Sequence, residues 1–147
     1  RQWWWEVNYS PSNPAERFAT ANEIRIPVGR RVAIRLRSED VIHSFWVPGQ
    51  QGKMDLIPGL ERETWIQADE PGTFRGQCAE YCGLQHTRMA LYVVAMDDEA
   101  SGQWRTEQLG PASAVSDALG VGGGTCSKVC IPRVRPIPLL RTSGMWN

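Results

Sequence analysis

A short stretch of the chain gathers most of the residues that could bind a soft metal ion. It runs from Cys78 to Met89 and contains two thiols, one imidazole and one thioether. Sulfur and imidazole donors favour copper or zinc over magnesium or calcium. The thioether separates copper from zinc, because structural zinc sites use cysteine and histidine, whereas a weak methionine ligand beside cysteine and histidine is typical of copper electron-transfer sites. The stretch therefore predicts a copper site.

The number of thiols and imidazoles favours two metal ions over one. The chain has two histidines, His86 within the stretch and His43, which lies 35 positions before Cys78. A mononuclear copper centre of this kind needs one cysteine, so Cys82 would be surplus. Two thiolates can instead bridge two copper ions, which leaves each ion one imidazole and one weak ligand such as Met89. An electron shared by both metals causes a small geometric change on transfer, and no position stays open for a substrate, so the set predicts electron transfer.

Two other interpretations of the same stretch stay open. Cys78 and Cys82 could form a disulfide in a redox-inert binding module, since an even number of cysteines in an exported domain often does so. The chain could also store or deliver copper, which requires exposed, exchangeable ligands on a flexible segment. Strands are expected on either side of the ligand loops, which favours a rigid site over delivery. The number of bound metal ions separates the disulfide module from the copper proteins.

Composition bounds the class of protein. The chain has 147 residues, 16 basic and 16 acidic, so its formal net charge is zero. That balance excludes a nucleic-acid binder that works by bulk electrostatics, and the length fits about one domain. Hydrophobic residues make up 41% of the chain, which is enough for a core. No run of about 18 apolar residues is present to span a bilayer.

Residues 1–96 are typical of a series of short strands. Alternating polar and apolar residues at 31–38 and 62–67 indicate half-buried strands, and 90–96 is the most apolar segment. Further strands are expected at 3–9, 23–27, 44–47 and 73–77, and a glycine- and proline-rich loop at 48–59. Short strands with turn residues between them predict an all-β sandwich or barrel. Acidic residues at 97–99 begin one predicted helix, which ends at 109.

The end of the chain differs in composition from the rest. Proline, alanine, serine and glycine dominate residues 110–124, which predicts a linker, and residues 125–147 show little periodicity, which predicts a flexible tail. The tail contains Cys126 and Cys130, and two thiols alone support no metal site. Their C-x-x-x-C spacing is wrong for the C-x-x-C-H haem attachment motif, and no histidine follows His86. No haem c is therefore expected.

Three motifs give the chain a specific resemblance to a known family. They read HSFWVP at 43–48, GKMDLIPG at 52–59 and GQCAEYCG at 76–83. With the following histidine and methionine they closely resemble subunit II of haem-copper cytochrome c oxidase, and QWWW at 2–5 is similar to the aromatic segment after that subunit's second transmembrane helix. The resemblance covers about residues 1–109. It implies a cupredoxin-like Greek-key domain that carries two copper ions in a binuclear centre, CuA.

The resemblance implies a role for each candidate ligand. The implied set is two bridging thiolates, two terminal imidazoles, one thioether and one backbone carbonyl: Cys78, Cys82, His43, His86, Met89 and Glu80. In the family, the carboxylate that matches Glu80 also reaches a magnesium ion at the interface with subunit I. Spacing alone would make Glu80 an ordinary loop residue.

Two further residues match family positions that face the electron donor. Trp3 matches the point at which electrons enter from cytochrome c, and Asp40 matches an acidic position in the cytochrome c docking area. Without the family, Trp3 would be a core or interface anchor. Asp40, in turn, would be a solvated carboxylate in a polar turn.

The resemblance also implies a place in a larger complex. The domain would accept one electron from cytochrome c and pass it to haem in subunit I, and the complex, which includes subunit III, would reduce dioxygen and pump protons. A transmembrane hairpin would precede Arg1, with this domain on the periplasmic, extracytoplasmic or intermembrane-space side of the membrane. The CuA domain of nitrous oxide reductase has similar ligands, but there an aromatic residue usually stands where Glu80 stands, so Glu80 and Lys53-Met54-Asp55 favour the oxidase.

Overall fold

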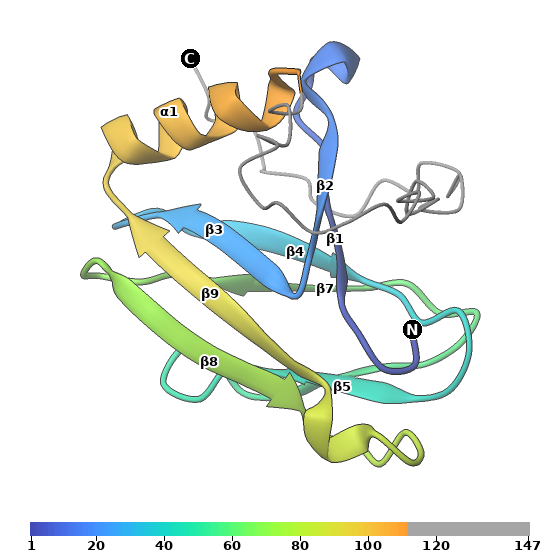
Figure 1. Ribbon diagram of the computed structural model, residues 1–147. Helices are drawn as coiled ribbons and strands as arrows, with labels where there is room; N and C mark the ends of the chain where they lie inside the picture. Colours follow the sequence, from blue (N-terminus) through green and yellow to red (C-terminus); the bar gives the residue numbers. More distant parts are fainter. Residues whose placement is uncertain (112–147) are drawn as a thin grey trace, which may run out of the picture.

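The computed structural model describes residues 1–111, which form a mostly β fold with one helix at its end (Figure 1). Its largest sheet has five strands in the order β3-β9-β8-β5-β6. Their bounds are Glu23–Pro27 for β3, Ala90–Met96 for β9, Gly72–Cys78 for β8, His43–Trp46 for β5 and Met54–Leu56 for β6. Strands β3 and β9 are parallel, and the other neighbours in this sheet are antiparallel.

Two smaller antiparallel pairs complete the β structure. Strand β4 (Val32–Leu36) pairs with β7 (Arg62–Ile66), and β1 (Glu6–Tyr9) pairs with β2 (Phe18–Ala21). A short 3-10 helix, η1 (Pro14–Glu16), lies in the connection between β1 and β2. All three sets of strands contribute side chains to one apolar core, so they hold the site as a single unit.

The core confirms the alternation expected along the strands. In β4, Val32, Ile34 and Leu36 are buried while the residues between them are only partly covered. In β9, Leu91 and Val93 are completely buried, and the central position of β9 between β3 and β8 explains this because both of its edges are paired. Burial of these aliphatic side chains supplies the main driving force for folding.

The predicted helix is present as α1, which spans Asp98–Leu109. It begins after Asp97, whose carboxylate Oδ1 accepts a hydrogen bond from the backbone N–H of Ala100 (2.7 Å) and so caps the first turn. Trp104 anchors the helix to the sheets because its ring contacts the rings of Tyr9 and Phe18, each with a centroid distance of 5.3 Å. Within residues 1–111, no helix is long and apolar enough to cross a membrane.

The structure corrects three details of the sequence prediction. Residues 48–59 are not entirely loop, because Met54–Leu56 forms β6 through backbone pairing with β5. The first strand begins at Glu6 and not at residue 3. Strand β2 was not predicted at all, and it forms by pairing with β1. The predicted linker from 112 onward, the tail at 125–147 and the cysteines at 126 and 130 lie outside the described residues.

Candidate metal centre

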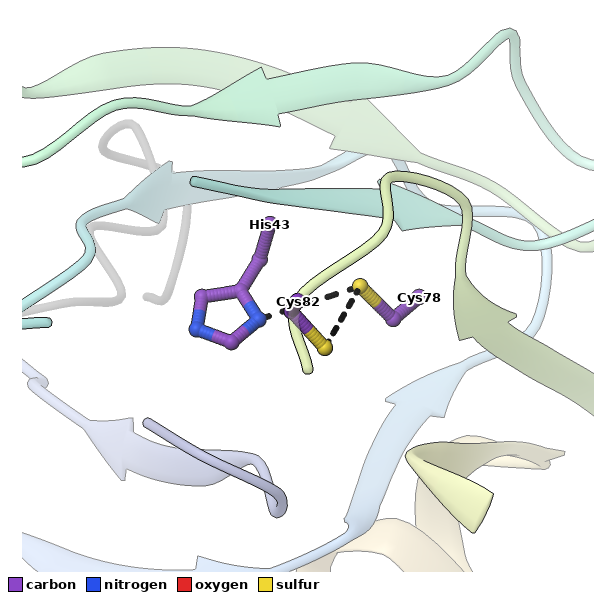
Figure 2. Close-up of side chains that lie close together, drawn as sticks. All are labelled: His43, Cys78 and Cys82. Carbon is purple, nitrogen blue, oxygen red and sulfur yellow. Dashed lines mark hydrogen bonds between the residues drawn. The ribbon is translucent and has the colours of Figure 1, made fainter. Parts of the chain in front are cut away.

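Two neighbouring strands bring the predicted ligands to one end of the sheet. His43 begins β5, and Cys78 ends β8. Because β5 and β8 run antiparallel, with Phe45 opposite Cys78, the start of one strand lies beside the end of the other. Cys82 follows in the loop after β8, as Figure 2 shows, so that both sulfur atoms lie close to the His43 ring.

The remaining candidates come from the same loop. The short 3-10 helix η2 (His86–Arg88) carries His86, and Met89 follows immediately before β9. The backbone N–H of Cys78 donates to the Met89 carbonyl (2.9 Å), which closes the base of the loop. The loop therefore returns its own end to the strand from which it started.

The donor atoms lie within a few ångströms of the two sulfurs. Cys78 Sγ lies 3.8 Å from Cys82 Sγ. On the side of Cys78, its Sγ is 3.8 Å from His43 Nδ1 and 3.1 Å from the Glu80 carbonyl oxygen. On the side of Cys82, its Sγ is 3.5 Å from His86 Nδ1 and 3.7 Å from Met89 Sδ. Each sulfur thus has its own imidazole and its own weak donor.

Most of this cluster is closed to solvent. The exposed fractions are 4% for Cys78, 3% for Cys82, and 1% each for His43 and Met89, whereas His86 is half-buried. The surface of the same loop is exposed, with Tyr81 at 73% and Leu84 at 92%. The site therefore combines enclosed donor atoms with an outward-facing rim that carries two large apolar side chains.

Electrostatics set the two thiols apart. Burial opposes ionisation of Cys78, but hydrogen bonds with His43 and with backbone groups outweigh it and lower the pKa of this thiol. Burial and the nearby charge of Cys78 raise the pKa of the Cys82 thiol. Two adjacent thiolates repel each other, and a bound cation removes that penalty because coordinating thiols lose their protons. The pair is therefore suited to a positively charged metal.

Trp3 and Glu80 differ in how they approach the site. The Trp3 indole Nε1–H donates to the Cys82 carbonyl oxygen (3.1 Å), which places this ring against the ligand loop. Glu80 presents its backbone carbonyl to Cys78, while its side chain is exposed. Gln2, which was not among the predicted site residues, also contacts this loop, because its side-chain Nε2–H donates to the Cys82 carbonyl (2.7 Å). No local spacing could have indicated this contact, which spans 80 positions.

Asp40 lies beside the site and not on a remote surface. Its Oδ1 is 2.8 Å from His43 Nε2, the ring nitrogen that faces away from the sulfurs. Burial opposes ionisation of Asp40, but hydrogen bonds from the Gln2 backbone N–H, from His43 and from the Val41 backbone N–H outweigh it and lower the pKa of this carboxyl. Burial likewise opposes protonation of His43, yet its hydrogen bonds with Cys78 and Asp40 raise the pKa of the ring.

Known proteins with similar sequences are subunits of terminal oxidases. The family described as cytochrome c oxidase subunit II, periplasmic domain, matches residues 11–96. Cytochrome c oxidase subunit 2 of Alkalihalophilus pseudofirmus is 41% identical over 103 residues, which cover 70% of this chain and 29% of that protein. The corresponding subunit of Cereibacter sphaeroides is 35% identical over 102 residues, with coverage of 69% and 34%. The chain therefore spans about a third of the length of these curated relatives.

A solved structure supports the same assignment. The periplasmic domain of subunit II of cytochrome oxidase from Bradyrhizobium japonicum superimposes with a TM-score of 0.67 at 30% identity, and the match covers 73% of this chain and 86% of that one. This match confirms the expected cupredoxin-like all-β fold with a short C-terminal helix. The chain belongs to the family of cytochrome c oxidase subunit II periplasmic domains.

Proposed function

We propose that this domain transfers electrons through a binuclear CuA centre, from cytochrome c to haem in subunit I of an oxidase. The observation that carries the proposal is the symmetric arrangement of donors, in which each of two adjacent sulfurs has one imidazole within 3.5–3.8 Å. A mononuclear site would leave one of these pairs without a metal.

The chemistry of the donors fits copper. The proposed ligands are the thiolates, imidazoles and weak donors gathered around the two sulfurs: Cys78, Cys82, His43, His86, Met89 and the Glu80 carbonyl. Soft thiolate and thioether donors select copper over hard cations. When bound, the two copper ions would supply one-electron chemistry with the electron shared between them. The protein holds the donors in place, which keeps reorganisation on electron transfer small.

Burial of the ligands argues against copper storage or delivery. A delivery protein must release its metal to a partner, so the thiolates, which hold the metal most tightly, have to be accessible. Here Cys78 and Cys82 are only 4% and 3% exposed, and they lie at the end of a paired strand and in a loop closed by backbone hydrogen bonds. We infer that the metal stays bound while electrons pass through the exposed rim.

The partner contacts proposed here follow the family. Trp3 is the proposed entry point for electrons, because its indole reaches the backbone carbonyl of the ligand Cys82. The exposed Glu80 carboxylate is positioned on the surface, where we propose that it meets magnesium and subunit I. Cytochrome c and subunit III are further proposed partners, with the domain on the periplasmic or other extracytoplasmic face of a membrane.

Copper binding to the 147-residue chain tests the proposal. The copper-free chain should take up two equivalents of copper, and Cys82→Ser should take up fewer. The second C-x-x-x-C pair provides a matched control, because Cys130→Ser removes one thiol outside the proposed site, as Cys82→Ser removes one within it. Uptake of one equivalent, or a loss of uptake only in this control, would contradict the proposal.

Electron transfer can be measured on the same sample. The loaded chain should accept one electron from reduced cytochrome c in a stopped-flow experiment, and the Cys82→Ser variant should not reproduce this reaction. A salt-dependent rate would indicate electrostatic docking. A loaded chain that accepts no electron would contradict the proposed function even if two copper ions are bound.

A further inference from the structure

The Asp40 carboxylate has both oxygens engaged in hydrogen bonds. Oδ1 lies 2.8 Å from His43 Nε2 and accepts from the Val41 backbone N–H (2.7 Å). Oδ2 accepts from the Gln2 backbone N–H (2.6 Å). The side chain of Asp40 is 29% exposed, whereas that of His43 is 1% exposed. The carboxylate therefore has a fixed orientation, and it contacts the buried ring directly.

This contact determines which ring nitrogen of His43 is free to bind a metal. An ionised carboxylate can only accept hydrogen bonds, so Nε2 must carry the hydrogen. In the neutral ring, which is the form that binds a metal, the other nitrogen, Nδ1, then presents its lone pair toward Cys78 Sγ, 3.8 Å away. Metal-binding histidines are commonly fixed in this way by a carboxylate on the second nitrogen. The His43 ring is 1% exposed, and Asp40 is the hydrogen-bond partner that the structure gives to its Nε2.

We propose that Asp40 is a positioning residue for the metal centre, which holds His43 in the tautomer and orientation that direct Nδ1 toward the two sulfurs. The inference rests on the proposed function, since His43 is a ligand only if the centre binds copper. It gives Asp40 a role beyond the docking of a basic partner. A docking carboxylate requires its charge, whereas a positioning carboxylate requires an acceptor oxygen at the correct place.

The same network reaches the second ligand loop through Gln2. Its backbone N–H holds the Asp40 carboxylate, while its side-chain Nε2–H donates to the Cys82 carbonyl. One residue thus connects the group that orients His43 to the loop that carries Cys82. Loss of either contact should therefore change the positions of both His43 and Cys82. The N-terminal segment thus helps to hold the site in place.

Three variants of the 147-residue chain separate positioning from docking. Asp40→Asn removes the charge and the acceptor for the Gln2 backbone N–H but can keep one acceptor oxygen toward His43, whereas Asp40→Ala removes both oxygens. Glu39→Gln is the matched control, because this neighbouring carboxylate instead pairs with the Arg1 guanidinium (2.7 Å). A docking role predicts equal effects of the two Asp40 variants on the reaction with cytochrome c. A positioning role predicts that Asp40→Asn restores most of what Asp40→Ala loses at the metal centre.

The first readout needs no copper. Nitrogen-15 NMR of the copper-free chain should show a hydrogen on His43 Nε2 that exchanges slowly, whether or not Nδ1 also carries a hydrogen. In Asp40→Ala, loss of a charge-assisted hydrogen bond should accelerate the exchange about tenfold to a hundredfold, while Glu39→Gln leaves it unchanged. An Nδ1–H tautomer in the native chain would overturn the proposal, and this result does not depend on whether any variant folds.

The second readout uses the copper-loaded chain. The copper hyperfine splitting and the reduction potential should change in Asp40→Ala, stay near the native values in Asp40→Asn and remain unchanged in Glu39→Gln. Native values in Asp40→Ala, together with unchanged proton exchange, would overturn the inference. If the native chain fails to bind two copper ions, the proposed function fails, and the NMR measurement still decides how His43 is held.

Discussion

Substitution of Gly83 by alanine tests how tightly the N-terminal segment packs over the ligand loop. Gly83 follows Cys82 and has a φ of +119°, which side chains rarely adopt. A Cβ atom there would lie 3.0 Å from Gln2 Nε2, 3.1 Å from Trp3 Cζ2 and 3.2 Å from Trp3 Nε1. The flexible Gln2 amide can swing away, whereas the rigid indole has to move as a unit.

The expected cost has two parts. Backbone strain at such a φ costs about 1–3 kcal/mol. The contacts would also disturb the two hydrogen bonds that Gln2 and Trp3 donate to the Cys82 carbonyl, each worth about 0.5–1.5 kcal/mol. We therefore expect Gly83→Ala to lower the free energy of unfolding by about 2–6 kcal/mol, with about 1–3 kcal/mol of that loss due to the contacts.

Urea unfolding of the copper-free chain measures this loss. Gly59→Ala is the matched control, because Gly59 also has a positive φ of +81° but an added Cβ would meet nothing within 4 Å. Gly59→Ala should therefore show backbone strain alone. If Gly83→Ala destabilises the chain no more than Gly59→Ala does, the N-terminal segment does not pack on the ligand loop as described, and the reasoning fails.

Three further predictions concern stability and redox behaviour. Met89→Leu should change the unfolding free energy of the copper-free chain by less than about 1.5 kcal/mol, because the volumes of the two side chains are similar. Voltammetry of the loaded chain should show a shifted reduction potential, because the weak methionine ligand tunes the potential of such copper sites; an unchanged potential would contradict this role of Met89. Burial raises the pKa of Tyr9 to about 12, so the unfolded chain loses this proton near pH 10 while the folded chain keeps it. The free energy of unfolding must therefore fall as pH rises from about 10 to 12. Urea unfolding should show that this free energy falls by about 2 kcal/mol more in the native chain than in Tyr9→Phe by pH 12. Equal losses in the two chains would contradict this prediction. A Cβ atom added at Gly102 in α1 would meet no atom within 4 Å. Gly102→Ala should therefore raise the free energy of unfolding by about 0.5–1 kcal/mol in the same assay. A lower free energy of unfolding would show that the helix is packed differently.

Local patterns in the sequence predicted the strands whose own residues decide their burial. Strand β9 was predicted with its observed bounds because Ala90–Met96 is a continuous apolar segment. Alternation identified β4, which spans Val32–Leu36 within the predicted range 31–38. Strand β6 has only three residues in a glycine- and proline-rich segment. It becomes a strand by pairing with β5, which is a tertiary interaction that no short window of sequence contains.

In the candidate site, too, local sequence identified some residues, whereas others are brought together only by the fold. Cys78, Cys82, His86 and Met89 lie close together in the sequence, so residue type and spacing were enough to group them. His43 could be added because the chain has only one other histidine. The contacts that hold the site in place, such as those of Gln2, join residues far apart in the sequence. They depend on the path of the N-terminal segment over the folded domain.

The EPR spectrum of the copper-loaded chain tests the central claim most directly. If one unpaired electron is shared equally by two copper nuclei, the spectrum has a seven-line hyperfine pattern. We expect this pattern in the native chain and its loss in Cys82→Ser, because a single remaining thiolate cannot bridge two ions symmetrically. A four-line spectrum from one copper nucleus in the native chain would contradict the account, since it would show a mononuclear site among the same donors.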